Sequence, residues 1–263
     1  MKRTLFDLSS KNVLITGGAG YLGSGMSEAV AAYGANLFIL GKQIEKNQKK
    51  ADELQAQYPE QVIESVPFDI RDEQIIDKAM QYIANKVESI DVLINNASYS
   101  CSKAFHEYSS GEWAEGIEGT INNVSRVTRY ALPYMMKQRN GNIINIASMY
   151  GMVAPNMEIY GDSGQNNPAN YGAGKAAIIQ LTKYLASVYA EYGIRANAVS
   201  PGPFPNPTVQ KNKQFIEALK GKNPMHRIGQ PEDLQGIIVY LASDASRYTT
   251  GQNIAVDGGW TAW

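Results

Sequence analysis

Two residues four positions apart, Tyr171 and Lys175, carry the strongest chemical signal in this 263-residue sequence. On a helix this spacing places a phenol and an ammonium on one face, about one turn apart. An isolated tyrosine has a pKa of about 10 and is a poor acid or base at neutral pH. A neighbouring cation favours the phenolate and lowers that pKa, so the pair suits general acid/base catalysis. Ser148, which follows an apolar run, can add a hydroxyl to the pair.

A glycine-rich turn spans residues 16–23, which read TGGAGYLG. It follows the apolar run 13–15 and precedes a helix-like stretch, 24–33. Strand, glycine turn and helix in this order are typical of a dinucleotide site. The glycines let the backbone approach a pyrophosphate, and the helix N-terminus offers free N–H groups to the anion. The alternative is a tight turn that holds no ligand.

The composition excludes several classes of protein. Lys and Arg together number 24 and Asp and Glu 25, so no excess of positive charge points to nucleic acid. One cysteine, Cys101, excludes an internal disulfide framework, and two histidines, His106 and His226, give no metal cluster. The N-terminus lacks an apolar signal region, and no apolar run reaches the roughly 18 residues of a membrane span. We therefore expect a soluble, cytoplasmic protein with no membrane partner.

Short apolar runs alternate with helical patterns along the chain, at 13–16, 36–40, 61–67, 90–95, 142–147, 195–200 and 252–256. This alternation predicts an α/β fold: a doubly wound, Rossmann-like, parallel seven-stranded sheet with helices on both faces. No linker divides the sequence, so we expect a single domain over residues 1–263. Ligands on such sheets bind beyond the carboxyl ends of the strands. The glycine-rich turn and Ser148 both fall there.

The sequence resembles the short-chain dehydrogenase/reductase family, in its compact single-domain branch. The resemblance runs from end to end, through the turn 16–23, Asp69, 95–97 (NNA), Ser148, Tyr171, Lys175, 200–202 (SPG) and the tail 251–260. It implies a Rossmann-like fold, a nicotinamide cofactor and hydride transfer between the cofactor and a carbonyl or alcohol carbon. It also implies a homotetramer.

The resemblance gives the matched residues their roles. Tyr171 would exchange a proton with the substrate oxygen, and Lys175 would hold the nicotinamide ribose and lower the pKa of Tyr171. Ser148 would hydrogen-bond the same oxygen and stabilise its developing charge. The family's proton relay also contains an asparagine; alignment without gaps places Thr120 there, with Asn122 as the alternative.

The chain departs from the family between Ser148 and Tyr171, which stand 23 positions apart where the family usually has about a dozen residues. The difference indicates an insertion at about 155–168. Tyr160 falls at the usual distance from Ser148, but Gly164 stands where its lysine would be, so Tyr171 remains the predicted acid/base. The insertion either lines the substrate site or is a surface excursion or a subunit contact.

The end of the second predicted strand bears on the choice of cofactor. An acidic residue there would bind the ribose 2′-OH of NAD. This chain instead has Gly41 and Lys42, with no carboxylate before Glu45. Gly41 removes the repulsion that a carboxylate would exert on a 2′-phosphate, and Lys42 offers a matching charge. The sequence therefore favours NADP(H), with NAD(H) as the alternative.

The residues that we expect to bind the cofactor lie in the glycine-rich turn and beyond the strand ends: Gly17, Gly20, Tyr21, Leu22, Gly23, Lys42, Asp69, Ile70, Asn95, Ala97, Tyr171, Lys175, Pro201 and Gly202. Tyr21 stands where the family has a glycine, and its side chain would pack over the pyrophosphate or toward the active site. Asp69 would face the adenine amino group or, alternatively, cap a helix that begins near Arg71.

The substrate is predicted from the polar character of the expected pocket. Residues 149–155, the insertion and 201–207 resemble bacterial sugar, sugar-acid or polyol oxidoreductases, such as gluconate 5-dehydrogenase. A pocket of amides and hydroxyls suits a polyhydroxylated substrate. One alternative is a 3-oxoacyl thioester reductase, with Lys103, Arg126 and Arg129 receiving an acyl carrier. The other is a non-catalytic member that senses the cofactor.

The sequence ends with two tryptophans close together, Trp260 and Trp263. Large apolar side chains at a terminus predict a buried contact. In tetrameric members of the family this tail packs near a neighbouring subunit, so we expect a homotetramer.

Overall fold

Seven strands form one sheet in the order β3-β2-β1-β4-β5-β6-β7, and every neighbouring pair is parallel. The strands are β1 (Asn12–Thr16), β2 (Asn36–Gly41), β3 (Ile63–Pro67), β4 (Val92–Asn95), β5 (Gly141–Ile146), β6 (Ile194–Pro201) and β7 (Asn253–Val256). Each predicted strand is confirmed to within two residues at either end. The computed structural model describes residues 4–161, 163 and 166–262, which include most of the predicted insertion.

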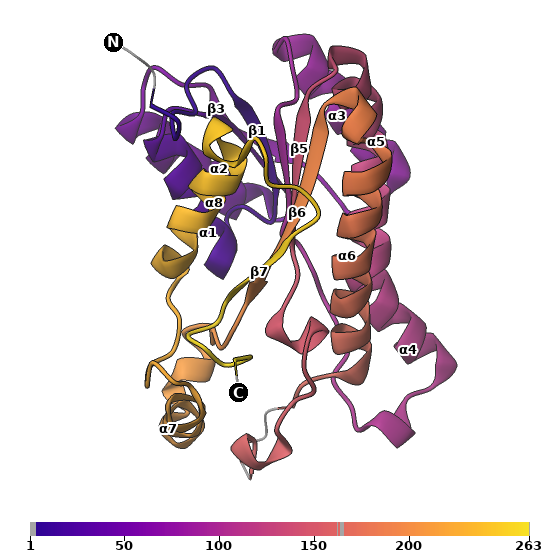
Figure 1. Ribbon diagram of the computed structural model, residues 1–263, viewed down its shortest axis with the longest axis vertical. Coiled ribbons are helices and arrows are strands. Elements are labelled where there is room, and N and C mark those ends of the chain that lie inside the picture. Colours follow the sequence, from indigo (N-terminus) through magenta and orange to yellow (C-terminus); the bar gives the residue numbers. More distant parts are fainter. Residues whose placement is uncertain (1–3, 162, 164–165, 263) are drawn as a thin grey trace.

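Helices connect the strands and cover the sheet on both sides. They are α1 (Tyr21–Ala32), α2 (Ile44–Gln57), α3 (Glu73–Lys86), α4 (Ser110–Ile117), α5 (Asn123–Gln138), α6 (Ala169–Val188), α7 (Lys213–Lys222) and α8 (Gln235–Ala242). One face packs against α1, α2 and α8, and the other against α3, α5 and α6 (Figure 1). In the described ranges, no helix is both long and apolar enough to cross a membrane.

The apolar strands follow from this covering on both faces. Successive side chains of a strand point to opposite faces, so a sheet covered on both sides buries every residue of its central strands. Ile15 of β1 packs in the core beneath α1 and α8, whereas its neighbour Leu14 packs beneath α3 and α5. Both are fully buried, and each such side chain contributes about 1.5–3 kcal/mol. The predicted single-domain, doubly wound sheet is confirmed.

Helix α6 approaches the end of α4 unusually closely. One π-helical turn, Glu118–Asn122, joins α4 to α5. A Cβ on Gly174 of α6 would overlap the hydroxyl of Thr120 in this turn. Thr120 is fully buried and donates its hydroxyl to the carbonyl oxygen of Gly116 at 2.7 Å. The contact sets how closely α6, which carries Tyr171 and Lys175, packs against this turn.

Substitution of Gly174 by Ala tests this contact. The added methyl must displace Thr120, so we expect the free energy of unfolding to fall by about 1–3 kcal/mol. Gly236→Ala on α8 is the matched control, because no atom lies within 4 Å of the added Cβ. It should raise the free energy of unfolding by about 0.5–1 kcal/mol. Urea unfolding followed by circular dichroism measures both; equal effects would contradict the close contact.

Candidate active site

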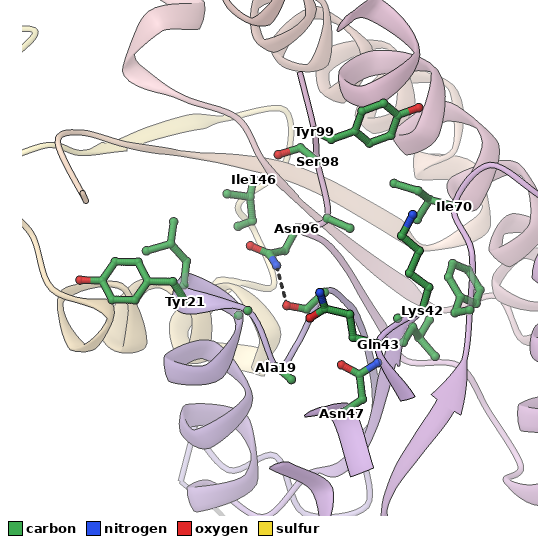
Figure 2. Close-up of a pocket in the computed structure, with 18 of the residues that line it drawn as sticks. Ala19, Tyr21, Lys42, Gln43, Asn47, Ile70, Asn96, Ser98, Tyr99 and Ile146 are labelled. Atoms are coloured by element: carbon green, nitrogen blue, oxygen red, sulfur yellow. Dashed lines mark hydrogen bonds between the residues drawn. The ribbon is translucent and has the colours of Figure 1, made fainter. Parts of the chain in front are cut away.

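A cleft of about 560 Å³ lies at the carboxyl ends of the strands, a volume typical of ligand pockets. Figure 2 shows part of its lining. Residues that follow six successive strands meet in it: Gly17 after β1, Lys42 after β2, Asp69 after β3, Asn96 after β4, Ser148 after β5 and Gly202 after β6. The sheet therefore brings together groups from most of the sequence at one site.

The glycine-rich turn leads from β1 into α1 at one side of the cleft. Gly17 has a φ of 65°, a left-handed conformation that favours glycine, and its N–H donates to the carbonyl oxygen of Leu40 at 2.7 Å. A Cβ on Gly23 would overlap the carbonyl oxygen of Gly17. The turn is tight because these positions carry no side chain, and the N-terminus of the 12-residue helix α1 faces the cleft.

Asn96 holds this turn in place. Its side-chain amide points toward the turn (Figure 2) and donates to the carbonyl oxygens of Thr16 at 3.0 Å and Gly17 at 3.1 Å. The hydroxyl oxygen of Thr16 in turn accepts the backbone N–H groups of Asn96 and Ala97, each at 3.0 Å. The ends of β1 and β4 are thus locked together. Asn96 lies within the NNA segment but was not among the residues predicted to bind the cofactor.

Asn95, which was predicted to bind the cofactor, does not line the cleft. It is buried, and its amide donates to Thr128 at 3.0 Å and to Asn145 at 2.8 Å. Because side chains alternate along a strand, Asn95 points to the opposite side from Asn96. The prediction of Asn95 as a cofactor ligand is therefore corrected to a role in joining β4, β5 and α5.

Ser148, Tyr171 and Lys175 all line the cleft. Lys175 is only 3% exposed and donates its ammonium to the carbonyl oxygen of Ile146 at 2.7 Å. Its nitrogen lies 5.4 Å from the centre of the Tyr171 ring. The Ser148 oxygen accepts the backbone N–H of Tyr150 at 3.2 Å. The geometry thus brings together the three residues that the sequence predicts to act as a unit.

The ionisation of this group differs from the prediction. Burial raises the pKa of Tyr171 above its usual value, and a hydrogen bond with Ser148 opposes that rise. Burial lowers the pKa of Lys175 to about 8. In the protein without a bound cofactor, burial of the phenol therefore has a larger effect on the pKa of Tyr171 than the groups that favour its ionised form. Lys175 directs its ammonium at the carbonyl of Ile146, and desolvation of the phenol outweighs the help from Ser148.

Neither candidate for the fourth member of the proton relay lines the cleft. The Thr120 hydroxyl is committed to the carbonyl oxygen of Gly116, beneath α6. Asn122 is exposed, and its amide donates to the carboxylate of Glu118 at 2.8 Å. Helical periodicity explains why Asn122 is exposed, because a residue two positions after Thr120 points away from the face that Thr120 occupies. In this structure Thr120 positions α6, and Asn122 faces solvent.

Tyr21 and Asp69 both line the cleft, and each is held by hydrogen bonds within the chain. Tyr21 lines the cleft at the start of α1, but its hydroxyl donates to Gln230 at 3.2 Å and accepts from Gln210 at 3.1 Å. Asp69 lines the cleft with Ile70, and its carboxylate accepts the backbone N–H of Arg71 at 3.0 Å. The cap of α3 is Asp72, not Asp69.

A cationic corner lies where β2 ends and α2 begins. Lys42, Lys46 and Asn47 line the cleft there, and Lys42 and Asn47 are drawn in Figure 2. Asn47 is 4% exposed, and its side-chain NH₂ has no hydrogen-bond partner among the described residues. A Cβ on Gly41 would lie 2.7 Å from that nitrogen. A residue with a side chain at position 41 would therefore displace Asn47.

Several lining residues were not predicted as ligands, among them Gln43, Lys46, Asn47, Arg71, Asn96 and Phe204. Lys46 lies in the first turn of α2, close in sequence to the end of β2, and this position was a usable signal for it. Arg71 lies with its guanidinium 4.1 Å from the centre of the Tyr99 ring and pairs with Glu115 at 2.8 Å. That contact joins segments far apart in sequence, and no local pattern reveals it.

These residues fit a dinucleotide. The turn without side chains at Gly17 and Gly23 admits a pyrophosphate to the backbone and to the first N–H groups of α1. The NH₂ of Asn47, which has no partner among the described residues, offers a hydrogen bond to an anion near Lys42 and Lys46. A parallel sheet with such a turn and a cleft holding Tyr, Lys and Ser defines a nicotinamide-dependent oxidoreductase.

Comparison with known proteins identifies the family to which the chain is similar. The profile of the family described as Enoyl-(Acyl carrier protein) reductase matches residues 18–261. The 3-oxoacyl-[acyl-carrier-protein] reductase of Thermotoga maritima is 34% identical over 256 residues, 96% of this chain and 98% of the relative. The 5-keto-D-gluconate 5-reductase of Escherichia coli K12 is 30% identical over 258 residues, 97% of each.

A solved structure shares the whole fold. Gluconate 5-dehydrogenase from Burkholderia cenocepacia, in complex with NADP and tartrate, has a TM-score of 0.88 and 28% identity, and 98% of each chain is covered. The chain belongs to the short-chain dehydrogenase/reductase family. It is an NAD(P)-dependent oxidoreductase that acts on CH–OH and C=O groups of small molecules.

The buried ammonium of Lys175 predicts a pH-dependent stability. Its pKa is about 8 when folded against 10.5 in the reference state, so below pH 8 the folded protein bears the full penalty of a buried charge. Between pH 8 and 10.5 the folded amine is neutral while the unfolded one still binds a proton. The stability of the wild type relative to Lys175→Met should therefore rise with pH, by about 3 kcal/mol over that window.

Urea unfolding at a series of pH values from 7 to 10 measures this difference. Lys183→Met on the same helix is the matched control, since Lys183 is exposed. A difference between wild type and Lys175→Met that stays constant over this range would show that the ammonium is not desolvated.

Proposed function

We propose that the chain is an NADP(H)-dependent oxidoreductase that interconverts a ketone and a secondary alcohol on a sugar acid, a sugar or a polyol. The relatives divide between two substrate classes. The name of the Thermotoga maritima relative specifies an acyl-carrier thioester, and that of the Escherichia coli relative specifies a keto-sugar acid. Identity is similar for both, so the choice depends on the site.

The choice between the two substrate classes rests on three basic side chains that are each paired with a carboxylate. Docking of an acidic acyl carrier needs free positive charge near the mouth of the cleft. The basic residues considered for that role are each paired with a carboxylate: Lys103 with Glu112, Arg126 with Glu118 and Arg129 with Glu73. Their charge is neutralised within the chain. This favours a small polar substrate over a carrier-bound thioester.

In the reduction, a bound nicotinamide cofactor supplies the hydride to the ketone carbon. Ser148 donates a hydrogen bond to the ketone oxygen and stabilises the charge that develops there. Tyr171 gives its phenolic proton to the same oxygen: the O–H bond of the phenol breaks as the O–H bond of the alcohol forms. The ammonium of Lys175 stabilises the phenolate that remains. Oxidation reverses these steps, with Tyr171 as the base.

The cationic corner supports NADP(H) as the preferred cofactor. Lys42 and Lys46 supply positive charge, and Asn47 supplies a buried donor without a partner in the described chain. Position 41 is a glycine, so no carboxylate stands there to repel a 2′-phosphate, and a side chain there would displace the amide of Asn47. The related Burkholderia structure contains NADP. NAD(H) remains the alternative cofactor.

The alternative of a non-catalytic cofactor sensor has one observation in its favour, the absence of an asparagine in the proton relay. Thr120 packs beneath α6 instead of facing the cleft. Against the sensor, Ser148, Tyr171 and Lys175 line a single cleft, and a protein that only binds cofactor needs no acid/base. We therefore favour a working enzyme.

We also propose that the chain assembles as a homotetramer, as the family resemblance implies. Trp260 is 8% exposed and packs within its own chain, in a cluster with Phe215 and Tyr160. Trp263 lies outside the described residues. Tyr184 and Val188 of α6 offer exposed apolar surface. Light scattering should give four times the mass of one chain; a monomer would contradict this.

Oxidation of NADPH by a ketone panel tests the proposed function. The panel contains 5-keto-D-gluconate, other keto-sugars and a 3-oxoacyl thioester, and the loss of NADPH absorbance is measured with purified protein. We expect turnover of a keto-sugar acid, lowered about 10²–10⁴-fold by Tyr171→Phe. Tyr248→Phe, at an exposed position that does not line the cleft, is the control. If the protein binds NADPH but oxidises it with no ketone of the panel, the result would favour the non-catalytic cofactor sensor.

Asn47→Ala tests the cofactor preference. The variant removes a donor without a partner in the described structure, so the fold should lose nothing while the affinity for NADPH falls about 10–100-fold. Lys42→Ala should weaken NADPH binding less, because that side chain is exposed. Affinity for NADH should not change, and Lys49→Ala on the same helix is the control. Fluorescence titration measures each; equal loss for NADPH and NADH would contradict a 2′-phosphate site.

A further inference from the structure

The order of the strands determines how a dinucleotide lies in the cleft. Under the proposed function, the nicotinamide lies near Ser148, after β5, and the pyrophosphate lies at the glycine-rich turn after β1. In the sheet, β2 and β3 lie on the other side of β1 from β5. Figure 2 shows the same separation, with Ile70 and Lys42 on one side of Asn96 and Ile146, at the end of β5, on the other. The adenosine half of the cofactor must therefore reach the ends of β2 and β3.

Residues 68–71, which we call the β3 wall, line the cleft at that end. They join β3 to α3 and belong to neither a helix nor a strand. The wall presents an apolar side chain, Ile70, and a planar cation, Arg71, and both suit an aromatic base such as adenine. Because the wall has no regular secondary structure, contacts from other elements must hold its shape.

Arg126 of α5 supplies one such contact. Its guanidinium donates to the backbone carbonyl oxygen of Ile70 at 2.7 Å. The Arg126 side chain is only 15% exposed, and it pairs with two carboxylates from different elements, Glu118 in the π-helical turn and Glu73 at the start of α3. The planar fork of an arginine holds several partners in a fixed geometry. The guanidinium therefore has a fixed place, and so does the backbone of Ile70.

Arg71 supplies a second contact, from within the wall itself. Its guanidinium lies 4.1 Å from the centre of the Tyr99 ring and pairs with Glu115 of α4 at 2.8 Å. Tyr99 in turn donates its backbone N–H to the carbonyl oxygen of Gly119 at 3.0 Å. A Cβ on Gly119 would overlap the backbone oxygen of Tyr99. The β3 wall is thus held against the end of α4 and the turn that follows it.

Arg126 contributes more to the shape of the wall than Arg71 does. The side chains of Arg71 and Glu115 are each 46% exposed, and an ion pair so exposed contributes little. The Arg126 guanidinium is mostly buried, and a hydrogen bond from a charged donor is stronger than one between neutral groups. Loss of Arg126 would also leave the carbonyl oxygen of Ile70 without this donor.

We infer that Arg126 is a positioning residue for the adenosine half of the cofactor: it holds the backbone of Ile70 and keeps the β3 wall in the shape that receives the adenine ring. This role rests on the proposed function, which puts the nicotinamide at the opposite end of the cleft. Arg126 does not line the cleft and acts through Ile70. Because NADPH and NADH share the adenine ring, Arg126 acts on both alike, unlike Asn47.

Arg126→Met tests this role, with Arg129→Met as the matched control. Both arginines lie on α5 and pair with Glu73, but of the two only Arg126 hydrogen-bonds a described residue that lines the cleft. Isothermal titration calorimetry measures the Kd of NADPH, of NADH and of reduced nicotinamide mononucleotide, which lacks the adenosine half. We expect Arg126→Met to weaken both dinucleotides by the same factor, about tenfold, and to leave the mononucleotide unchanged. Arg129→Met should change none of the three.

Arg126→Lys guards against general damage to the fold. Lysine keeps the charge beside the two carboxylates but lacks the fork that also reaches Ile70, so both dinucleotides should again weaken together. Loss of NADPH affinity alone would show that Arg126 acts by its charge on the 2′-phosphate and would overturn the positioning role. Equal loss for the mononucleotide, or no loss for any ligand, would overturn it as well and leave the proposed function intact. A wild-type protein that binds neither dinucleotide would overturn the proposed function itself.

Discussion

The hydrogen bond from the Lys175 ammonium to the carbonyl of Ile146 fixes the geometry of the whole site. A buried cation must find a partner, and here burial alone lowers its pKa, with a strand carbonyl as the acceptor. The bond joins α6 to the end of β5. Ser148 follows Ile146 by two residues, and Tyr171 precedes Lys175 by one helical turn. One contact therefore sets the position of the hydroxyl and of the phenol together.

A second constraint holds the cofactor side of the cleft. Thr16 and Asn96 exchange hydrogen bonds across the ends of β1 and β4, so the glycine-rich turn cannot move independently of the sheet. Preorganised groups of this kind stabilise a transition state without a cost of rearrangement during the reaction. The two constraints act on adjacent strands, β4 and β5. The site is rigid because the central strands of the sheet carry both of them.

The sequence predicted the features that follow from local pattern. Apolar runs indicated the strands, and the carboxyl ends of parallel strands had to converge, which brought Ser148 to Tyr171 and Lys175. It could not predict the environment of a side chain. The spacing of Tyr171 and Lys175 shows that they share a helix face, but not that burial raises the pKa of the phenol. Asn95 and Asn96 are adjacent and chemically identical, and their roles differ only because successive side chains point to opposite sides. The environments of Asn47 and Tyr160 depend on contacts with distant segments of the chain, which the periodicity of the sequence does not show.

Tyr21, in the place of a family glycine, links the two halves of the cleft mechanically. It begins α1, whose N-terminus faces the cleft, and its hydroxyl joins Gln210 and Gln230. Those two glutamines bracket α7, and Gln210 also donates to the carbonyl of Pro205, in the segment that follows β6. Tyr21 therefore joins the start of α1 to the segments that precede and follow α7. The physical consequence is that one side chain holds the start of α1 and both flanks of α7 together, which a glycine at position 21 could not do.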